Sequence, residues 1–178
     1  MNQQNVTESD VNRSDVNGSK LRWLWLTLVV IVLDLGTKAM ATAMLTYGDP
    51  VPVMPIFNLT LLHNTGAAFS FLAGASGWQR WFFVTLAAVV SVVLFRWLKT
   101  LKPDETWSAI AIVLILGGAL GNVYDRVVHG YVVDFLHFYW NDYHFPAFNI
   151  ADTAITIGAG MMIIDIFRKP SEPEDAAG

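Results

Sequence analysis

Four long apolar stretches, separated by shorter polar connections, dominate the pattern of residues along this chain. They cover about residues 21–44, 81–98, 107–124 and 150–167. Each holds roughly as many apolar residues as the 20 or so that an α-helix needs to cross the hydrocarbon core of a bilayer. The pattern therefore predicts four transmembrane helices.

The first stretch is longer than the apolar core of a cleavable signal peptide, and no A-x-A-like cleavage site follows it. We therefore expect it to be a retained helix. Residues 1–20 are polar and rich in Asn and Ser, which predicts a disordered tail. The expected organisation is this tail, a transmembrane domain over 21–168, and a second tail over 169–178.

Two connections are long enough to form structure outside the membrane. Residues 46–80 include a stretch rich in Pro, β-branched and aromatic residues with a Gly-Asp-Pro turn, which predicts short strands. Residues 125–149 form a shorter segment between the third and fourth helices. The predicted fold is thus an all-α membrane protein with four transmembrane helices, a small extracytoplasmic β cradle and a short extracytoplasmic connecting segment.

Composition supports this class and excludes several others. The chain is 54% hydrophobic and 15% charged, with a mean hydropathy of +0.44. Most of its net charge of −4 belongs to the two polar tails, and no basic stripe suggests binding to nucleic acid. The absence of cysteine excludes thiol catalysis, disulfides and cysteine-ligated metals.

The distribution of Lys and Arg predicts the orientation, because cytoplasmic connections of membrane proteins are enriched in these residues. If the N-terminus is inside, three basic residues belong to the outer side, namely Lys38, Arg80 and Arg126. The inner side then holds the other eight: Arg13, Lys20, Arg22, Arg96, Lys99, Lys102, Arg168 and Lys169. Both tails and the 99–106 loop are therefore expected to be cytoplasmic, with segments 46–80 and 125–149 outside.

Four aspartates, Asp34, Asp125, Asp134 and Asp152, lie in or beside the apolar stretches. With this topology, all four reach the outer leaflet. A carboxylate in hydrocarbon is costly, so an acid inside a membrane is a candidate for a functional site. Their convergence on one face predicts a reaction centre there.

Two of these acids have basic neighbours. Asp34 and Lys38 are four residues apart on one helix face, with the acid N-terminal, which favours a structural ion pair. Asp125 precedes Arg126, and a neighbouring cation keeps a carboxylate ionised. A structural or substrate-anchoring role for Asp125 is therefore at least as well supported as a catalytic one.

The other two acids have contrasting surroundings. Asp134 lies within an apolar run with no adjacent base, so desolvation is expected to raise its pKa. Asp152 opens the fourth helix just after Asn149, a candidate cap, and a helix N-terminus favours the ionised carboxylate. An acid–base pair needs two carboxyl groups with such opposite tendencies. The alternative, two polar residues in an interfacial loop, stays open on this evidence.

Other motifs have weaker chemical implications. Residues 117–121 contain a GxxxG pattern, which favours close helix packing and lacks the GK[ST] of a phosphate loop. The histidines, His63, His129, His137 and His144, show no HExxH or paired ligand spacing, so no metal site is expected.

Two further classes of protein fit parts of the pattern. A small proton-coupled transporter or channel subunit also carries acids and lysines within the membrane. However, four spans without an inverted repeat are few for a transporter. A non-catalytic scaffold explains the GxxxG pattern but leaves the polar motifs on one leaflet unexplained.

Five motifs, in order along the chain, resemble those of bacterial lipoprotein signal peptidase (signal peptidase II). They are DLGTK at 34–38, NTGAAFS at 64–70, GGALGNVYDR at 117–126, VVDF at 132–135 and FNIAD at 148–152. The resemblance extends from about residue 23 to residue 167.

This resemblance implies an intramembrane aspartic endopeptidase without a cofactor. It implies removal of the signal peptide from prolipoproteins immediately before a diacylglyceryl-modified cysteine, and inhibition by globomycin. Matched by motif, the catalytic dyad is Asp134 and Asp152. The supporting polar residues are Asp34, Lys38, Asn64, Asn122, Asp125, Arg126 and Asn149. The implied location is the bacterial cytoplasmic (inner) membrane.

Overall fold

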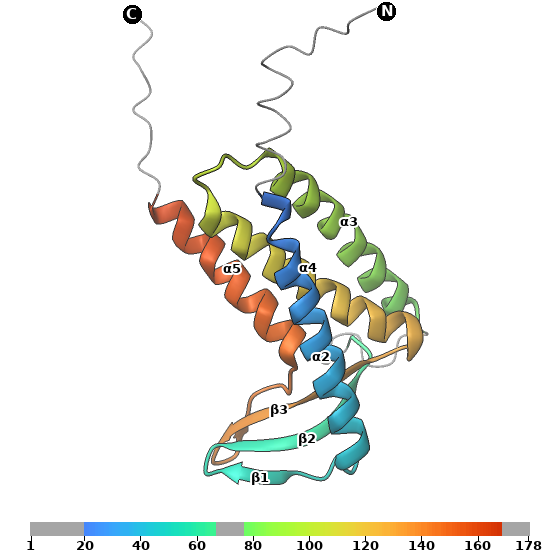
Figure 1. Cartoon of the computed structure of the whole chain (residues 1–178). Coiled ribbons are helices and arrows are strands. Elements are labelled where there is room, and N and C mark those ends of the chain that lie inside the picture. The colour runs from blue at the N-terminus through green and yellow to red at the C-terminus, as the bar shows by residue number, and fades with distance from the viewer. Residues whose placement is uncertain (1–19, 67–76, 169–178) are drawn as a thin grey trace, which may run out of the picture.

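The computed structural model describes residues 20–66 and 77–168. Almost all of both predicted tails, and residues 67–70 of the second motif, lie outside this range. The described part contains helices α2 (Leu24–Met44), α3 (Trp78–Thr100), α4 (Thr106–Val128) and α5 (Ile150–Arg168) (Figure 1). Its strands are β1 (Val51–Met54), β2 (Phe57–Asn64), β3 (Val132–Trp140) and β4 (Tyr143–His144).

All four of these helices are long and apolar enough to cross a membrane, with lengths of 19–23 residues. They lie alongside one another, and the sheet lies beyond one end of the bundle (Figure 1). The predicted fold class is confirmed: the chain is a multi-pass membrane protein with a small antiparallel sheet. The observed helices begin and end within a few residues of the predicted spans.

Helix α4 forms the centre of the bundle and packs against α2, α3 and α5. In its most apolar window 61% of the residues are buried, against 11% for α3. Leucines from the end of α3 and aliphatic residues from the start of α4 form one buried cluster with the loop between them. The outward faces of α2, α3 and α5 keep large apolar side chains exposed, as lipid-facing helices do.

Three glycines on α4 allow α2 and α5 to approach closely. A Cβ atom on Gly117 would meet the side chain of Val30, and one on Gly121 would lie 2.5 Å from a carboxylate oxygen of Asp34. A Cβ atom on Gly118 would clash with the backbone carbonyl of Ala151 on α5. The GxxxG pattern therefore serves helix packing, as predicted, and it brings the polar residues of three helices together.

The sheet has four strands in the order β1-β2-β3-β4, all antiparallel to their neighbours. The prediction that the strands come from residues 46–80 was incomplete, because β3 and β4 belong to the 125–149 segment. The sequence of β3, VVDFLHFYW, is rich in β-branched and aromatic residues. It pairs with β2 along most of its length, with a bulge between Leu59 and Leu62.

This pairing fixes where Asp134 lies. It stands opposite Leu62 in the register of β2 and β3, close to the end of the bundle. The chain then passes through the β3–β4 hairpin and returns to pair Phe148 with Leu136. Helix α5 begins two residues after Phe148, so the return of the chain brings Asp152 close to β3.

Candidate active site

The first turn of α5 is fixed by Asn149. Its side-chain oxygen accepts a hydrogen bond from the backbone N–H of Asp152 at 2.9 Å, and its backbone carbonyl accepts one from the Thr153 hydroxyl at 2.9 Å. Asn149 is thus the N-cap predicted from the sequence. It is completely buried, so its side chain is held in one place.

The amide nitrogen of the same Asn149 side chain reaches β3. It donates to Asp134 Oδ1 at 2.8 Å and lies 3.2 Å from the backbone carbonyl oxygen of Val133. One cap residue therefore contacts the backbone of Asp152 and the carboxyl group of Asp134. The two acids, 18 residues apart in sequence, are tied to a common side chain.

The carboxyl group of Asp134 is almost entirely buried, with an exposed fraction of 2%. Burial raises its pKa to about 7, and the negative charge of Asp152 adds to this effect. Hydrogen bonds from Asn64 and Asn149 act in the opposite direction. The predicted rise in the pKa of Asp134 is confirmed, and near neutral pH this group exchanges a proton readily.

Asp152 has a different connection to the helix bundle. Asn122 on α4 donates from Nδ2 to Asp152 Oδ1 at 2.7 Å, and its Oδ1 accepts from Lys38 Nζ at 3.1 Å. The fixed orientation of the Asn122 amide therefore gives Asp152 a donor and, through Lys38, a positive charge behind it. One amide side chain therefore links the carboxyl group of Asp152 to Lys38.

Lys38 is the centre of a buried ion cluster. Its Nζ lies 2.7 Å from Asp34 Oδ2 and 2.9 Å from Asp125 Oδ2. Asp34 also accepts from the backbone N–H of Ala151 at 2.9 Å, and Asp125 accepts from that of Val133 at 3.1 Å. The cluster joins α2 and α4 to the start of α5 and the start of β3.

This arrangement confirms the predicted pair of Asp34 and Lys38 and corrects the expectation for Asp125. We expected Arg126 to be the cation that keeps Asp125 charged, whereas the ion pair is with Lys38. The reason is helical geometry: adjacent residues point about 100° apart around the axis, so Asp125 and Arg126 face different neighbours. The sequence spacing gave no indication that Lys38 forms ion pairs with two acids.

Arg126 instead faces a cavity of about 750 Å³ at the ends of α4 and α5. Its guanidinium lies over the ring of Phe83 at 5.1 Å and donates to the backbone carbonyl of Asn122 at 3.3 Å. Asp152 and Asn64 also line this cavity. Asp134 is not among the lining residues. It is hydrogen-bonded to Asn64, which does line the cavity, and to Asn149.

Most of the cavity wall was not predicted from the sequence. Apolar and weakly polar side chains and backbone from the end of β2, α3, α5 and the segment before α5 complete it: Gly66, Phe83, Phe145, Pro146, Ala147, Phe148, Thr153, Thr156 and Ile157. Thr156 follows Asp152 by four positions, and Thr153 precedes Thr156 and Ile157 by three and four, which is helical spacing. All the predicted site residues meet at this end of the bundle.

Comparison with known proteins agrees with this arrangement. Residues 26–168 match the family model described as signal peptidase (SPase) II. The chain is 55% identical over 161 residues to the lipoprotein signal peptidase of Pseudomonas paraeruginosa, covering 89% of this chain and 95% of that protein. It is 53% identical over 154 residues to that of Vibrio vulnificus, covering 85% and 92%.

Solved structures give the same result. A bacterial membrane enzyme determined by the in meso method at 2.3 Å superposes with a TM-score of 0.75 and 31% identity, over 88% of this chain and 94% of that one. A second, at 1.9 Å, gives a TM-score of 0.74 and 32% identity, over 84% and 94%. The family match excludes the two alternative classes, a transporter or channel subunit and a non-catalytic scaffold. The chain belongs to the signal peptidase II family of membrane proteases.

Proposed function

We propose that this chain is an intramembrane aspartic endopeptidase that removes the signal peptide from diacylglyceryl-modified prolipoproteins, with Asp134 and Asp152 as its catalytic dyad. The observation that carries the assignment is the pair of links through Asn149. This residue caps Asp152 and donates to Asp134, whose pKa is raised to about 7. Two linked carboxyl groups, one of them with a raised pKa, suit hydrolysis by a shared proton.

In the proposed reaction, ionised Asp152 takes a proton from a water molecule held between the two acids. The water oxygen attacks the carbonyl carbon of the scissile peptide bond. Protonated Asp134 donates its proton to the carbonyl oxygen, so the tetrahedral intermediate forms as a neutral diol.

Collapse of this intermediate breaks the C–N bond. Asp152, now protonated, supplies the proton to the leaving amine, and Asp134 recovers its own proton from the diol. The products are the carboxyl end of the signal peptide and the free amine of the lipidated cysteine. Both acids return to their starting states, so the reaction needs no cofactor.

The lining of the cavity beside Asp152 supports the proposal that the substrate is lipidated. Its walls combine a few polar groups, including Asn64 and Arg126, with aromatic and aliphatic side chains such as Phe83 and Ile157. Acyl chains in the outer leaflet hold the modified cysteine at this depth, next to the dyad. We propose membrane lipids as partners on the same basis, and inhibitors of the globomycin type as competitors for this cavity.

We further propose that the enzyme belongs to the bacterial inner membrane with both termini in the cytoplasm. The eight-to-three distribution of Lys and Arg supports this orientation. It puts the sheet and the site near the outer leaflet, with the α3–α4 loop at the opposite end of the bundle.

Because the chain has no cysteine, single-cysteine variants test the orientation directly. Asn141→Cys is expected to react with an impermeant thiol reagent in spheroplasts, and Thr100→Cys is expected to react only after lysis. Labelling of position 100 from outside contradicts the proposed orientation.

The test of the dyad is single-turnover cleavage of a diacylated prolipoprotein at matched amounts of folded protein. Asp134→Asn and Asp152→Asn are each expected to abolish measurable cleavage. Asp104→Asn, which removes an exposed carboxyl group at the inner end, is the matched control and should cleave normally. Asp125→Asn should retain more activity than either dyad variant once folding is normalised, because its carboxylate is engaged with Lys38.

Two results contradict the assignment. Substantial cleavage by Asp134→Asn together with none by Asp125→Asn makes Asp125 the partner of Asp152. Normal cleavage by both dyad variants excludes an aspartic mechanism at this site.

A further inference from the structure

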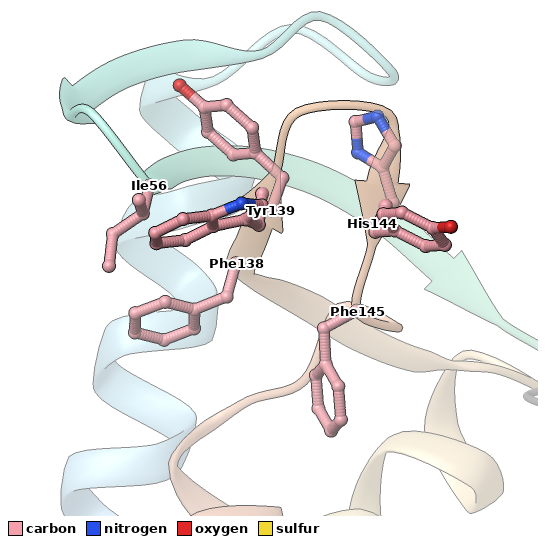
Figure 2. A pocket seen from close by; sticks show the side chains of 7 residues that line it. Ile56, Phe138, Tyr139, His144 and Phe145 are labelled. Carbon is pink, nitrogen blue, oxygen red and sulfur yellow. The ribbon is translucent and has the colours of Figure 1, made fainter.

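The two faces of the β3–β4 hairpin differ in chemistry. Phe138 and Phe145 project from one side (Figure 2). Phe138 stacks on Phe148 with ring centroids 6.0 Å apart. Tyr139 and His144 project from the other side (Figure 2). These two are cross-strand partners, and their rings stack with centroids 5.9 Å apart.

The face that carries His144 also carries His137, two positions before Tyr139 on β3. His144 Nδ1 and His137 Nε2 lie 3.1 Å apart. The two imidazoles therefore meet edge to edge with one nitrogen of each directed at the other. Sequence spacing did not predict this pair, because the hairpin turn brings together residues that are seven positions apart.

The second nitrogen of His137 is fixed by β2. His137 Nδ1 lies 3.1 Å from the hydroxyl oxygen of Thr60. When Nδ1 carries the proton and donates to Thr60, the lone pair of Nε2 is directed toward His144. A histidine that binds a metal is oriented in this way, with its other ring N–H donated to a neighbouring oxygen.

His144 is exposed at the edge of the sheet. An ion can therefore reach the pair from the solvent.

A buried amide with an unsatisfied oxygen lies beside the pair. Asn58 stands directly opposite His137 in the β2–β3 register and is 8% exposed. Its Oδ1 has no hydrogen-bond partner among the described residues. Buried amide oxygens rarely stay unpaired, so this one is suited to accept from a water molecule bound at the site.

We propose that His137 and His144 form a binding site for a borderline divalent transition-metal ion, such as Zn²⁺ or Cu²⁺, on the outer face of the sheet. Metal–imidazole bonds of about 2.0–2.1 Å separate two adjacent ligand nitrogens by roughly 2.9–3.4 Å, and the observed separation is 3.1 Å. Thr60 orients His137.

This site has two protein ligands. No cluster of three or more His, Cys, Asp or Glu side chains able to hold a metal occurs within residues 20–66 and 77–168. Water fills the remaining positions, so the affinity is moderate. A bound ion fastens the two-residue strand β4 to β3, and the chain that follows, from Phe145 to Phe148, lines the cavity at Asp152.

The experiment uses the purified full chain in detergent without a polyhistidine tag. Binding of Zn²⁺ is measured by calorimetry, and bound Cu²⁺ is examined by electron paramagnetic resonance for nitrogen ligands. The wild-type chain is expected to bind one ion and to show two nitrogen ligands. His137→Gln and His144→Gln should each weaken binding at least about tenfold, and Thr60→Val should weaken it less, by its effect on His137.

His63→Gln and His129→Gln are the matched controls, because each removes an imidazole that contacts Tyr131 away from the pair. Both should bind the ion as the wild type does. The affinities are compared between variants of equal melting temperature, or they are corrected for the fraction of each variant that is folded. The proposal is overturned if the wild-type chain shows no saturable binding, if Cu²⁺ shows fewer than two nitrogen ligands, or if a control variant loses as much affinity as His144→Gln.

Discussion

Replacing Lys38 with methionine tests how the buried ion cluster supports the site. Methionine keeps most of the length of the lysine stem and removes its charge and its hydrogen-bond donors, so the change creates little cavity. It takes the shared ammonium group from the carboxylates of Asp34 and Asp125, and these side chains are 0% and 2% exposed. Asp34 then keeps the backbone N–H of Ala151, and Asp125 keeps that of Val133 and a contact of 3.6 Å with the His129 ring.

The expected loss of stability is large. Breaking a buried pair by removing one partner costs about 3–5 kcal/mol, because it leaves an uncompensated charge in a medium of low dielectric constant. Here one cation serves two acids at 2.7 and 2.9 Å, so we expect the upper part of that range. For a chain of this size the corresponding fall in melting temperature is about 10 °C or more.

The assay is thermal unfolding in detergent, followed by tryptophan fluorescence, since the chain has seven tryptophans. Lys99→Met is the matched control, because Lys99 is exposed in the last turn of α3. It should shift the midpoint by no more than a degree or two. Asp34→Asn combined with Lys38→Met should recover part of the loss but not all of it, because Asp125 still lacks its contact with Lys38.

Equal midpoints for Lys38→Met and Lys99→Met refute the argument, since they mean that the cluster contributes no net stability. Complete recovery in the double variant with Asp34→Asn is also informative. It shows that the contact of Lys38 with Asp125 contributes nothing to folding stability, although Lys38 Nζ and Asp125 Oδ2 are only 2.9 Å apart.

Two further predictions follow from the geometry. Because the pKa of Asp134 is raised from 3.8 to about 7, the folded state binds its proton more tightly than the unfolded state. The stability of the wild type should therefore fall as pH rises from about 4 to 7, and it should stay level above pH 7. Thermal unfolding at pH 8 should show that Asp134→Asn is more stable than the wild type by up to about 4 kcal/mol. Single-turnover cleavage should decline above pH 7, because the proposed reaction needs protonated Asp134. Gly118→Ala should lower both the melting temperature and the rate of cleavage, because the added methyl group displaces Ala151 on α5. The expected loss of folding stability is about 1–3 kcal/mol. Gly160→Ala has open space around its Cβ position and should leave both quantities unchanged.

The spans and the convergence of the acids on one face could be predicted from the sequence, because they depend on local hydrophobicity and on the order of segments. The Asp34–Lys38 pair and the Asn149 cap were also predictable, since both lie within one helix or one helix terminus. These features follow from spacing along a regular element. No knowledge of tertiary packing is needed for them.

The contacts that distinguish the acids from one another could not be predicted in the same way. The partner of Asp125 is Lys38, 87 positions away in sequence, and the donor to Asp152 is Asn122 on another helix. Both depend on how closely α2 and α5 pack against α4, which is decided by the glycines at 117, 118 and 121. The strand β3 was missed for a related reason: its pairing with β2 is a long-range contact.

The two proposed catalytic acids occupy different kinds of structure, and this accounts for the raised pKa of Asp134. Asp134 belongs to a strand, where a side chain has no helix terminus to stabilise its charge and is buried between sheet and bundle. Asp152 belongs to the first turn of a helix, where backbone N–H groups point toward the carboxylate. Asn149 stands at the junction and contacts both through opposite ends of one amide. Asn149→Asp keeps both acids but replaces this amide with a carboxyl group. It therefore puts a third carboxyl group beside Asp134 and disturbs the distribution of the proton on which the proposed reaction depends.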